Sequence, residues 1–326
     1  MSNEKSFDQI CKRLRKKLDE TVKEISYDGT ALSGGLDTSI VNYIASNHKS
    51  DLESVSVGFD ESSMEDLEYA KKVADELDIV NHTRIFSFDE ALEVAKKVIE
   101  ILETFDPMEI RNSISIYFML EKAKQVGLNK ILTGDGSDEL FAGYSFLYKL
   151  PEEELPNKLD RISKIMKFSS EPIAKDLGLE AKLPFIEEDF KRFAQNIDPN
   201  FLVGERDGKK IGKWILRKAY EGRLPDELIW RRKAPIEVGS GTTIFPEKFD
   251  SMIGDRDFEE RKNEIKENDG VTIRSKEQLH YYKLYKTKFG VPEASDSKKR
   301  ICPFCGTNLP KKANFCRTCG NGVEQE

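Results

Sequence analysis

The sequence predicts an α/β fold: a parallel twisted sheet flanked by helices, with extra helices toward the C-terminus and a small zinc ribbon at the end. Three observations support this prediction. Short apolar segments alternate with helix-like ones through the first half of the chain. A glycine turn at residues 33–39 joins an apolar segment to a helix-like pattern. Two Cys-x-x-Cys pairs stand close together near the C-terminus.

The elements follow one another in a regular order. An amphipathic surface helix is expected at residues 5–24, strands near 53–59, 81–88 and 130–133, and helices near 64–77, 89–103 and 112–126. Helices between short apolar strands indicate a parallel sheet covered on both faces, whose ligands bind beyond the carboxyl ends of the strands. From about residue 151 the pattern is largely helical, and we expect these helices to pack on the same sheet. The predicted division is an N-terminal helix (1–24), a sheet-containing domain (25–289), a linker (290–297) and the ribbon (298–326).

The composition limits the class of protein. The 326 residues allow one large or two modest domains, and 38% hydrophobic and 34% charged residues are typical of a soluble globular chain. No apolar run approaches the roughly 18 residues of a membrane span, and the charged N-terminus is unlike a signal peptide, so we expect a cytoplasmic protein. The net charge of −7 argues against a nucleic-acid-binding surface over the whole chain, although residues 298–317 carry six basic and no acidic residues.

Residues 31–40 read Ala-Leu-Ser-Gly-Gly-Leu-Asp-Thr-Ser-Ile, a pattern typical of a phosphate-binding loop. Gly34 and Gly35 let the backbone approach a phosphate, and the free N–H groups of the first helical turn point at it. Further hydroxyl donors come from Ser33, Thr38 and Ser39. A polyphosphate would repel Asp37 unless a divalent cation lay between them, which favours a Mg²⁺ ligand. The alternative is an ordinary acid in a first helical turn.

The phosphate loop lacks the lysine of a kinase-type loop. Another segment must therefore supply a cation that stabilises the negative charge of a reacting phosphate group. Residues 230–241 begin with a basic run and continue with proline and glycine, and Lys233 is the candidate. The alternative is a solvated basic turn.

A second polar stretch, residues 133–144, reads Thr-Gly-Asp-Gly-Ser-Asp-Glu-Leu-Phe-Ala-Gly-Tyr. Its three carboxylates, Asp135, Asp138 and Glu139, would repel one another without a cation or cationic partner. Asp138 is the natural second Mg²⁺ ligand opposite Asp37. The alternative is an acidic turn on the surface.

The C-terminal cysteines have the spacing of a zinc site: Cys302, Cys305, Cys316 and Cys319. Gly306 and Gly320 follow the second cysteine of each pair, which suits the tight turns that direct two thiolates at one tetrahedral Zn²⁺. Two disulfides are the alternative, and a cytosolic setting disfavours them. The fifth cysteine, Cys11, lies on the apolar face of the N-terminal pattern, so we interpret it as a packing residue.

Taken in this order, these stretches resemble the synthetase domain of the glutamine-dependent asparagine synthetase family, which includes the β-lactam synthetases. That family belongs to the PP-loop ATP pyrophosphatases, so the resemblance implies an adenine nucleotide alpha hydrolase-like fold. The resemblance spans roughly residues 28–285. It also includes four further stretches: Ser56-Val-Gly-Phe59, the segment 106–115, Glu180-Ala-Lys-Leu-Pro-Phe185, and Lys213-Trp-Ile-Leu-Arg217. The resemblance implies a ligase in which ATP transfers AMP to a carboxylate, Asp37 and Asp138 hold Mg²⁺, and ammonia attacks the acyl-adenylate.

The resemblance also implies roles for individual residues. Lys233 and Asp135 correspond to catalytic residues. The ATP site would be built from Leu32, Ser33, Gly34, Gly35, Asp37, Thr38, Ser39, Val57, Gly58 and Gly134, and the substrate site would include Arg111 and Tyr144.

Three departures from the family pattern concern the substrates. The family's amino-terminal glutaminase domain, with its nucleophilic cysteine at residue 2, has no counterpart, because Ser2 stands there, so we expect free ammonia or a separate glutaminase as the nitrogen source. The family's catalytic glutamate is shortened to Asp135. Residues 159–182 match the family poorly and Lys182 replaces an arginine, so the acceptor need not be aspartate itself and we expect aspartate or a similar carboxylate.

Two other interpretations remain open. The chain could adenylate a base as a tRNA- or nucleobase-modifying enzyme, with the basic ribbon holding RNA. It could also be a non-catalytic protein whose ribbon docks a glutaminase or another partner.

Overall fold

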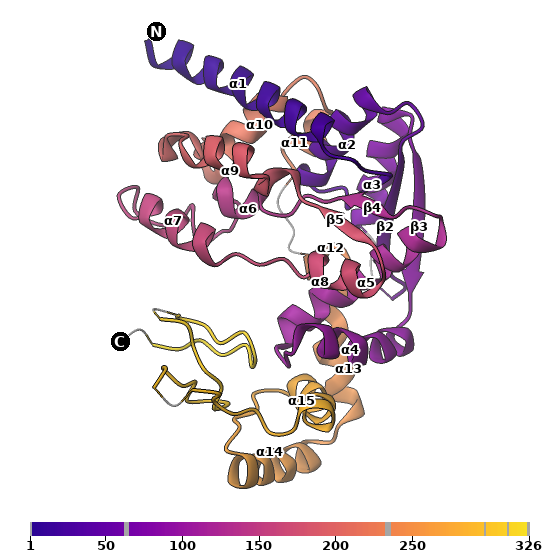
Figure 1. Ribbon diagram of the computed structural model, residues 1–326, viewed down its shortest axis with the longest axis vertical. Coiled ribbons are helices and arrows are strands. Elements are labelled where there is room, and N and C mark those ends of the chain that lie inside the picture. The colour runs from indigo at the N-terminus through magenta and orange to yellow at the C-terminus, as the bar shows by residue number, and fades with distance from the viewer. Residues whose placement is uncertain (1, 62–64, 232–235, 297, 312, 325–326) are drawn as a thin grey trace. The chain divides into compact units, whose positions relative to one another are not determined.

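The computed structural model describes residues 2–61, 65–231, 236–296, 298–311 and 313–324. The chain divides into two compact units, each built from segments that are distant in sequence (Figure 1). Unit 1 comprises residues 1–57, 65–84 and 119–234, and unit 2 comprises residues 58–64, 85–118 and 235–326. The predicted domain boundaries after residues 24, 289 and 297 stay predictions.

A five-stranded sheet with the order β3-β2-β1-β4-β5 organises the fold. Its strands are β1 (Gly29–Ala31), β2 (Glu53–Phe59), β3 (Val80–Phe86), β4 (Lys130–Leu132) and β5 (Glu180–Lys182). Strand β1 runs parallel to β2 and β4, and β4 runs parallel to β5. The predicted parallel sheet is confirmed. Because β1 and β4 are parallel neighbours, the segments that follow them leave the sheet at the same edge.

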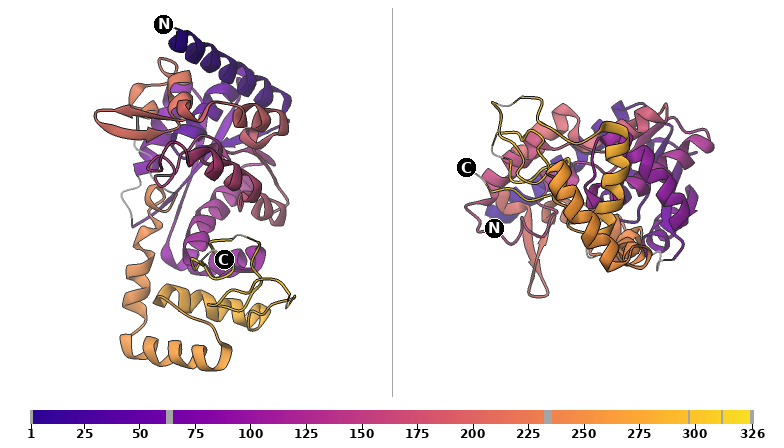
Figure 2. Two further views of the ribbon diagram at one scale, coloured as in Figure 1. Left: turned by 90° about the vertical axis from the view of Figure 1, so that its left-hand side faces the viewer. Right: turned by 90° about the horizontal axis from the view of Figure 1, so that it is seen from below.

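Unit 1 surrounds the sheet with helices and one hairpin. Its helices are α1 (Ser2–Glu24), α2 (Leu36–His48), α3 (Glu65–Leu77), α6 (Ser137–Leu140), α7 (Leu155–Ile165), α8 (Ser170–Asp176), α9 (Glu188–Gln195), α10 (Trp214–Tyr220) and α11 (Asp226–Ile229), with 3₁₀ turns η1 (Pro184–Ile186) and η2 (Pro199–Phe201). The antiparallel hairpin of β6 (Val203–Arg206) and β7 (Lys209–Gly212) stands out from the ribbon of this unit (Figure 2). Helix α5 (Pro107–Gln125) begins in unit 2 and ends in unit 1.

The structure differs from the predicted elements at several places. Helix α5 starts at Pro107 rather than near residue 112, because proline suits the first helical turn and Asp106 Oδ1 accepts a bond from the Met108 N–H. The region after 151, predicted as largely helical, contains β5, β6 and β7. Strands of three or four residues are too short to show an alternating pattern.

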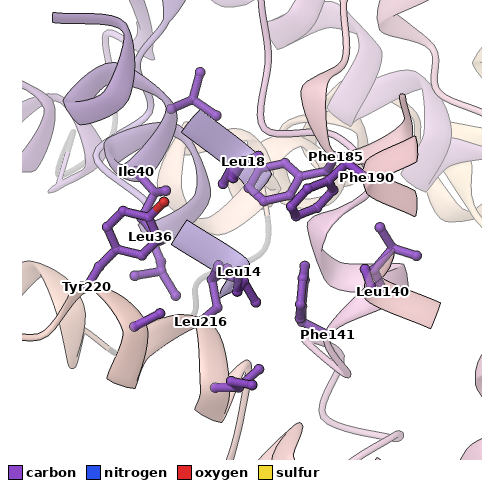
Figure 3. Packing of buried hydrophobic residues seen from close by; sticks show 14 of the residues in the cluster. Leu14, Leu18, Leu36, Ile40, Leu140, Phe141, Phe185, Phe190, Leu216 and Tyr220 are labelled. Atoms are coloured by element: carbon purple, nitrogen blue, oxygen red, sulfur yellow. The ribbon is translucent and has the colours of Figure 1, made fainter. Parts of the chain in front are cut away.

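The core of unit 1 joins the N-terminal helix to the segments around the sheet (Figure 3). Leu14 and Leu18 of α1 are fully buried and belong to one cluster with Leu216 and Tyr220 of α10. Cys11 is also buried in this cluster, and burial raises the pKa of its thiol to about 11. A thiol of that pKa is a poor nucleophile at neutral pH, in agreement with its interpretation as a packing residue.

Unit 2 contains helices packed through aromatic side chains. Its helices are α4 (Phe88–Leu102), α12 (Ile236–Gly239), α13 (Phe245–Met252), α14 (Asp255–Asp269) and α15 (Lys276–Phe289), with the 3₁₀ turn η3 (Thr242–Ile244), and the cysteine-rich segment follows them (Figure 2). Helix α4 begins with a capping box in which Ser87 and Glu90 bond each other's backbone N–H groups. Phe88 contacts Phe245 and Phe249 edge to face. Among the described helices, none combines the length and the apolar character that a bilayer crossing needs.

Candidate active site

The predicted phosphate loop lies between β1 and α2 in unit 1, and its own hydroxyl groups shape it. The Ser33 N–H donates to Thr38 Oγ1 over 3.1 Å, and the two hydroxyl oxygens are 3.0 Å apart. Ser39 Oγ donates to the Gly35 carbonyl over 2.7 Å. Gly34 has a left-handed φ of +70°. Leu32, before the turn, is buried, whereas Ser33 is exposed. The loop is therefore a preformed turn that presents polar groups at the start of a helix.

The acidic stretch after β4 packs directly against this loop. A Cβ atom at Gly134 would lie 2.9 Å from the Asp37 Cβ atom and 3.2 Å from the Thr38 nitrogen, so only glycine allows this close approach. Ser137 Oγ donates to Asp37 Oδ1 over 2.7 Å. The glycine turn after β1 and the acidic stretch after β4 therefore meet at one edge of the sheet.

Lys213 joins the two acids that were predicted to bind magnesium. Its Nζ atom lies 2.5 Å from Asp37 Oδ2 and 2.7 Å from Asp138 Oδ1. The Lys213 residue is 3% exposed. Burial alone would lower the pKa of Lys213, but the adjacent carboxylates of Asp138 and Asp37 outweigh it and raise the pKa, so the side chain is an ammonium. Asp37 and Asp138 thus lie together around one cation.

Backbone features on both sides make room for this contact. Lys213 precedes α10 with a left-handed φ of 56°, which is uncommon for a side chain of this size. At Gly143, an added Cβ atom would lie 1.8 Å from Asp138 Oδ1 and 2.3 Å from Lys213 Cε. Lys213 was noted in the sequence only within the stretch 213–217 and not as a site residue, so its role is a finding of the structure.

Two further acids of the same stretch are bonded to hydroxyl groups. Asp135 Oδ2 accepts from Ser170 Oγ over 2.5 Å and from Thr133 Oγ1 over 2.9 Å. The Glu139 Oε1 atom accepts from the Tyr144 hydroxyl over 2.5 Å. Burial raises the pKa of Asp135 and of Glu139, and the neighbouring Asp138 adds to both shifts.

The charge balance of this cluster fits a divalent cation. Asp37 and Asp138 contact the ammonium of Lys213, and Asp135 and Glu139 lie close enough to Asp138 for its charge to raise their pKa values. Carboxylate oxygens are the ligands that Mg²⁺ prefers, and the ion commonly completes its coordination with phosphate oxygens and water. An arrangement of this kind, next to a phosphate loop, can hold a nucleotide polyphosphate with its metal.

Comparison with known proteins identifies the family. The match to the asparagine synthase family covers residues 13–176 and 171–267, which is more than half of the chain. The chain belongs to the asparagine synthase family.

Individual relatives agree with this assignment. A probable glutamine-hydrolyzing asparagine synthetase of Dictyostelium discoideum is 30% identical, with 93% of this chain and 60% of that protein aligned. The glutamine-hydrolyzing asparagine synthetase 1 of Lotus japonicus is 34% identical over 65% of this chain and 39% of that protein. The chain therefore spans between two fifths and three fifths of these relatives. An NH3-dependent NAD synthetase of Campylobacter jejuni is 14% identical over 80% of this chain and 94% of that one, with a TM-score of 0.38, which supports no conclusion about activity.

The other predicted site residues of this asparagine synthase family member belong to both units or lie outside the described residues. Val57, at the end of the unit 1 part of β2, is half-buried, and Gly58 begins the first segment of unit 2. Arg111 lies on α5 in unit 2, where its Nε atom is 3.5 Å from Glu277 Oε1. Lys233 lies outside the described residues. The roles of these residues stay predictions.

The four C-terminal cysteines form one cluster in unit 2. Their sulfur atoms all lie within 4.8 Å of one another, and none of the four is in a disulfide. Gly306 and Gly320 have φ values of +80° and +72°, and each N–H bonds the carbonyl of the first cysteine of its pair. Four converging thiols on two such turns can hold one tetrahedral metal ion.

The second cysteine turn packs on the rest of unit 2. The Phe105 N–H donates to the Thr318 carbonyl over 2.8 Å, and Gln278 Nε2 donates to the Cys319 carbonyl over 2.7 Å. A Cβ atom at Gly320 would lie 2.2 Å from Asp106 Oδ1. The cysteine cluster is thus bonded to the start of α5 and to α15.

Proposed function

We propose that the protein is an ATP-dependent, AMP-forming amide ligase that adenylates a carboxylate, aspartate or a similar acid, and transfers ammonia to it. One observation carries this proposal: Asp37 and Asp138 both contact the buried ammonium group of Lys213 beside a glycine-rich phosphate loop. Membership of the asparagine synthase family supports it.

The loop residues would bind the ATP phosphates through backbone N–H groups and the hydroxyls of Ser33, Thr38 and Ser39. Leu32, Val57 and Gly58 are proposed for the adenine. Asp37 and Asp138 would hold Mg²⁺, which supplies charge neutralisation for the pyrophosphate group. Lys213 holds these two carboxylates together at the edge of the loop.

The chemistry consists of two substitutions. A carboxylate oxygen attacks the α-phosphorus of ATP, the bond from that phosphorus to the bridging oxygen breaks, and pyrophosphate leaves. The nitrogen of ammonia then attacks the acyl carbon, the bond from carbon to the AMP oxygen breaks, and the nitrogen loses a proton. Lys233 is proposed to stabilise the departing pyrophosphate. Asp135, Arg111 and Tyr144 are proposed around the acceptor.

A structural Zn²⁺ is proposed for Cys302, Cys305, Cys316 and Cys319. All four thiols are buried, and their mutual distances fit tetrahedral coordination. The nitrogen source is proposed to be free ammonia or a separate glutaminase.

The decisive experiment follows oxygen and nitrogen atoms. The purified protein is incubated with ATP, Mg²⁺, ¹⁵N-ammonium and a panel of carboxylic acids labelled with ¹⁸O, including aspartate. We expect pyrophosphate release, ¹⁸O in the AMP phosphate and ¹⁵N in an amide. D37N should abolish all three, and D51N, which changes an exposed acid after α2, should not. If no carboxylate of the panel yields labelled AMP, the proposal is wrong.

The structure gives less support to RNA binding by the ribbon, because the basic segment is partly engaged within the ribbon. The Arg300 guanidinium donates to the carbonyls of Ala313 and Glu324, and Lys299 lies 3.7 Å from Asp296. These contacts do not favour a nucleic-acid surface. Salt-dependent tRNA binding that K298Q/K311Q weakens would favour this candidate over the ligase.

A further inference from the structure

Arg231, in the basic stretch after α11, contacts the phosphate loop. Its side chain is 8% exposed. Its Nη1 atom donates to the Gly34 carbonyl over 3.1 Å, and its Nη2 atom donates to Asp66 Oδ1 over 2.6 Å. The guanidinium carbon lies 3.9 Å from the centre of the Tyr69 ring. One buried guanidinium thus connects the loop to the first turns of α3.

The turn at Gly34 is tightly packed against the same helix. A Cβ atom there would lie 2.6 Å from the Ala70 nitrogen, 2.6 Å from Tyr69 Cβ and 2.7 Å from the Asp66 carbonyl oxygen. The φ of +70° also requires glycine. The position of the loop therefore depends on its contact with α3. Arg231 strengthens this contact, because it bonds both the Gly34 carbonyl and Asp66 of α3.

The backbone that carries Arg231 is itself fixed by a second buried arginine. Arg217 is 4% exposed, and its Nη1 atom donates to the carbonyls of Ile229 and Arg231, the latter over 3.2 Å. Arg217 lies on α10, one turn after Lys213. The contacts thus run continuously from the two acids through Lys213, α10 and Arg217 to Arg231 and the loop.

We propose that Arg231 is a positioning residue that sets the orientation of the Gly34–Gly35 peptide in the ATP site. In a trans peptide the carbonyl and the N–H point in opposite directions. Because Arg231 holds the Gly34 carbonyl, the Gly35 N–H points away from Arg231 and donates to Ser33 Oγ over a long 3.3 Å. A phosphate oxygen can replace this weak partner. This role of Arg231 rests on the proposed function in one respect, namely that the anion bound by the loop is the polyphosphate of ATP.

Arginine is required for this arrangement, because its planar fork bonds the carbonyl and the carboxylate at once. Lysine keeps the charge but offers a single nitrogen atom. We expect R231K to weaken the binding of ATP with Mg²⁺ by about tenfold, the usual effect of losing one hydrogen bond to a buried group. We also expect faster hydrogen exchange in a peptide that covers residues 31–40.

The experiment measures both effects on the full chain. The dissociation constant of ATP with Mg²⁺ is determined by calorimetry, and hydrogen exchange is followed without nucleotide. R223K is the matched control, since Arg223 is an exposed arginine of the same unit, and it should change neither quantity. Should R231K fail to fold, D66N takes its place. We expect D66N to weaken ATP binding and to speed hydrogen exchange at residues 31–40, both by less than R231K.

Each outcome decides a separate claim. Affinity within twofold of the wild type together with unchanged exchange at residues 31–40 would overturn the positioning role. Faster exchange spread over the whole unit would also overturn it, because this indicates a general loss of stability. If the wild type binds no ATP, the proposed function is wrong, and the exchange of residues 31–40 alone tests whether Arg231 orders the loop.

Discussion

Replacing Lys213 by methionine tests the buried contact at the centre of the proposed site. The substitution removes the ammonium and keeps most of the side-chain volume. At an effective dielectric constant of about 20, each of the two contacts corresponds to roughly 6 kcal/mol of attraction, and much of this offsets the cost of dehydrating the charges. Removing one partner of a buried pair costs about 3–5 kcal/mol, because the remaining charge loses its partner. The side chains of Asp37 and Asp138 are 20% and 21% exposed, so water screens part of the loss, and we expect K213M to lower the free energy of unfolding by about 3 kcal/mol.

The natural assay is urea unfolding followed by tryptophan fluorescence. The only two tryptophans, Trp214 and Trp230, both lie in unit 1, so their fluorescence follows the unit that contains the contact. K209M is the matched control, since Lys209 is an exposed lysine of the hairpin, and it should change the free energy of unfolding by less than about 0.5 kcal/mol. Adding D37N and D138N to K213M removes the uncompensated charges and should recover part of the loss. A loss below about 1 kcal/mol in K213M, or no recovery in the triple variant, would refute the reasoning.

The same variants test the proposed magnesium site. In K213M the two carboxylates lack their ammonium, so a divalent cation should bind there more favourably than in the wild type. We expect millimolar Mg²⁺ to raise the unfolding midpoint of K213M more than that of the wild type. It should leave the triple variant unchanged.

Three further predictions concern unit 2. Burial raises the pKa of Glu277 to about 7 from 4.5, so the folded state binds a proton that the unfolded state releases. Glu277 alone should therefore lower the free energy of unfolding by up to about 3 kcal/mol as pH rises from 4.5 to 7. In urea titrations at several pH values, E277Q should remove this part and leave the smaller fall due to Asp106, whose pKa burial raises to about 6. Gly320 and Gly270 have similar left-handed φ values, but only Gly320 lacks space for a Cβ atom. G270A should cost about 1 kcal/mol and G320A roughly 2–4 kcal/mol in urea titrations followed by tyrosine circular dichroism, and equal losses would contradict the proposed packing on Asp106. A zinc chelator should lower the melting temperature followed by tyrosine circular dichroism, C319S should do the same, and insensitivity of the wild type would contradict the metal site.

The parts of the site that the sequence predicts are those with local patterns. The residues that determine the glycine turn at 33–35, including the helix N-terminus that follows it, are close together in the sequence. The same is true of the acidic turn around Asp138. Their convergence follows from a general property of parallel sheets, and the close approach of Gly134 to Asp37 confirms it. The cysteine spacing likewise predicts one cluster, which the structure contains.

Lys213 and Arg231 could not be found in this way, because their partners are distant in sequence. Lys213 lies 176 residues from Asp37, and Arg231 lies 197 residues from Gly34. Each contact depends on where α10 and the segment after α11 pack in unit 1, and no local periodicity contains that information. A charge count gives the one available signal: three acids at 135–139 and Asp37 require nearby cations, but the count does not say which lysine supplies one.

The contacts of the cysteine cluster also change how its role must be tested. The sequence predicts a linker at residues 290–297 followed by a compact ribbon. In the structure the carbonyls of Thr318 and Cys319 accept bonds from Phe105 and Gln278, and Gly320 fits against Asp106. Deleting residues 297–326 would remove these hydrogen bonds, each of which contributes about 0.5–1.5 kcal/mol, and would uncover the buried surface around Asp106. Lost activity after deletion would therefore not separate RNA or partner binding from the collapse of unit 2, whereas the charge variant K298Q/K311Q leaves the cysteine turns intact and does separate them.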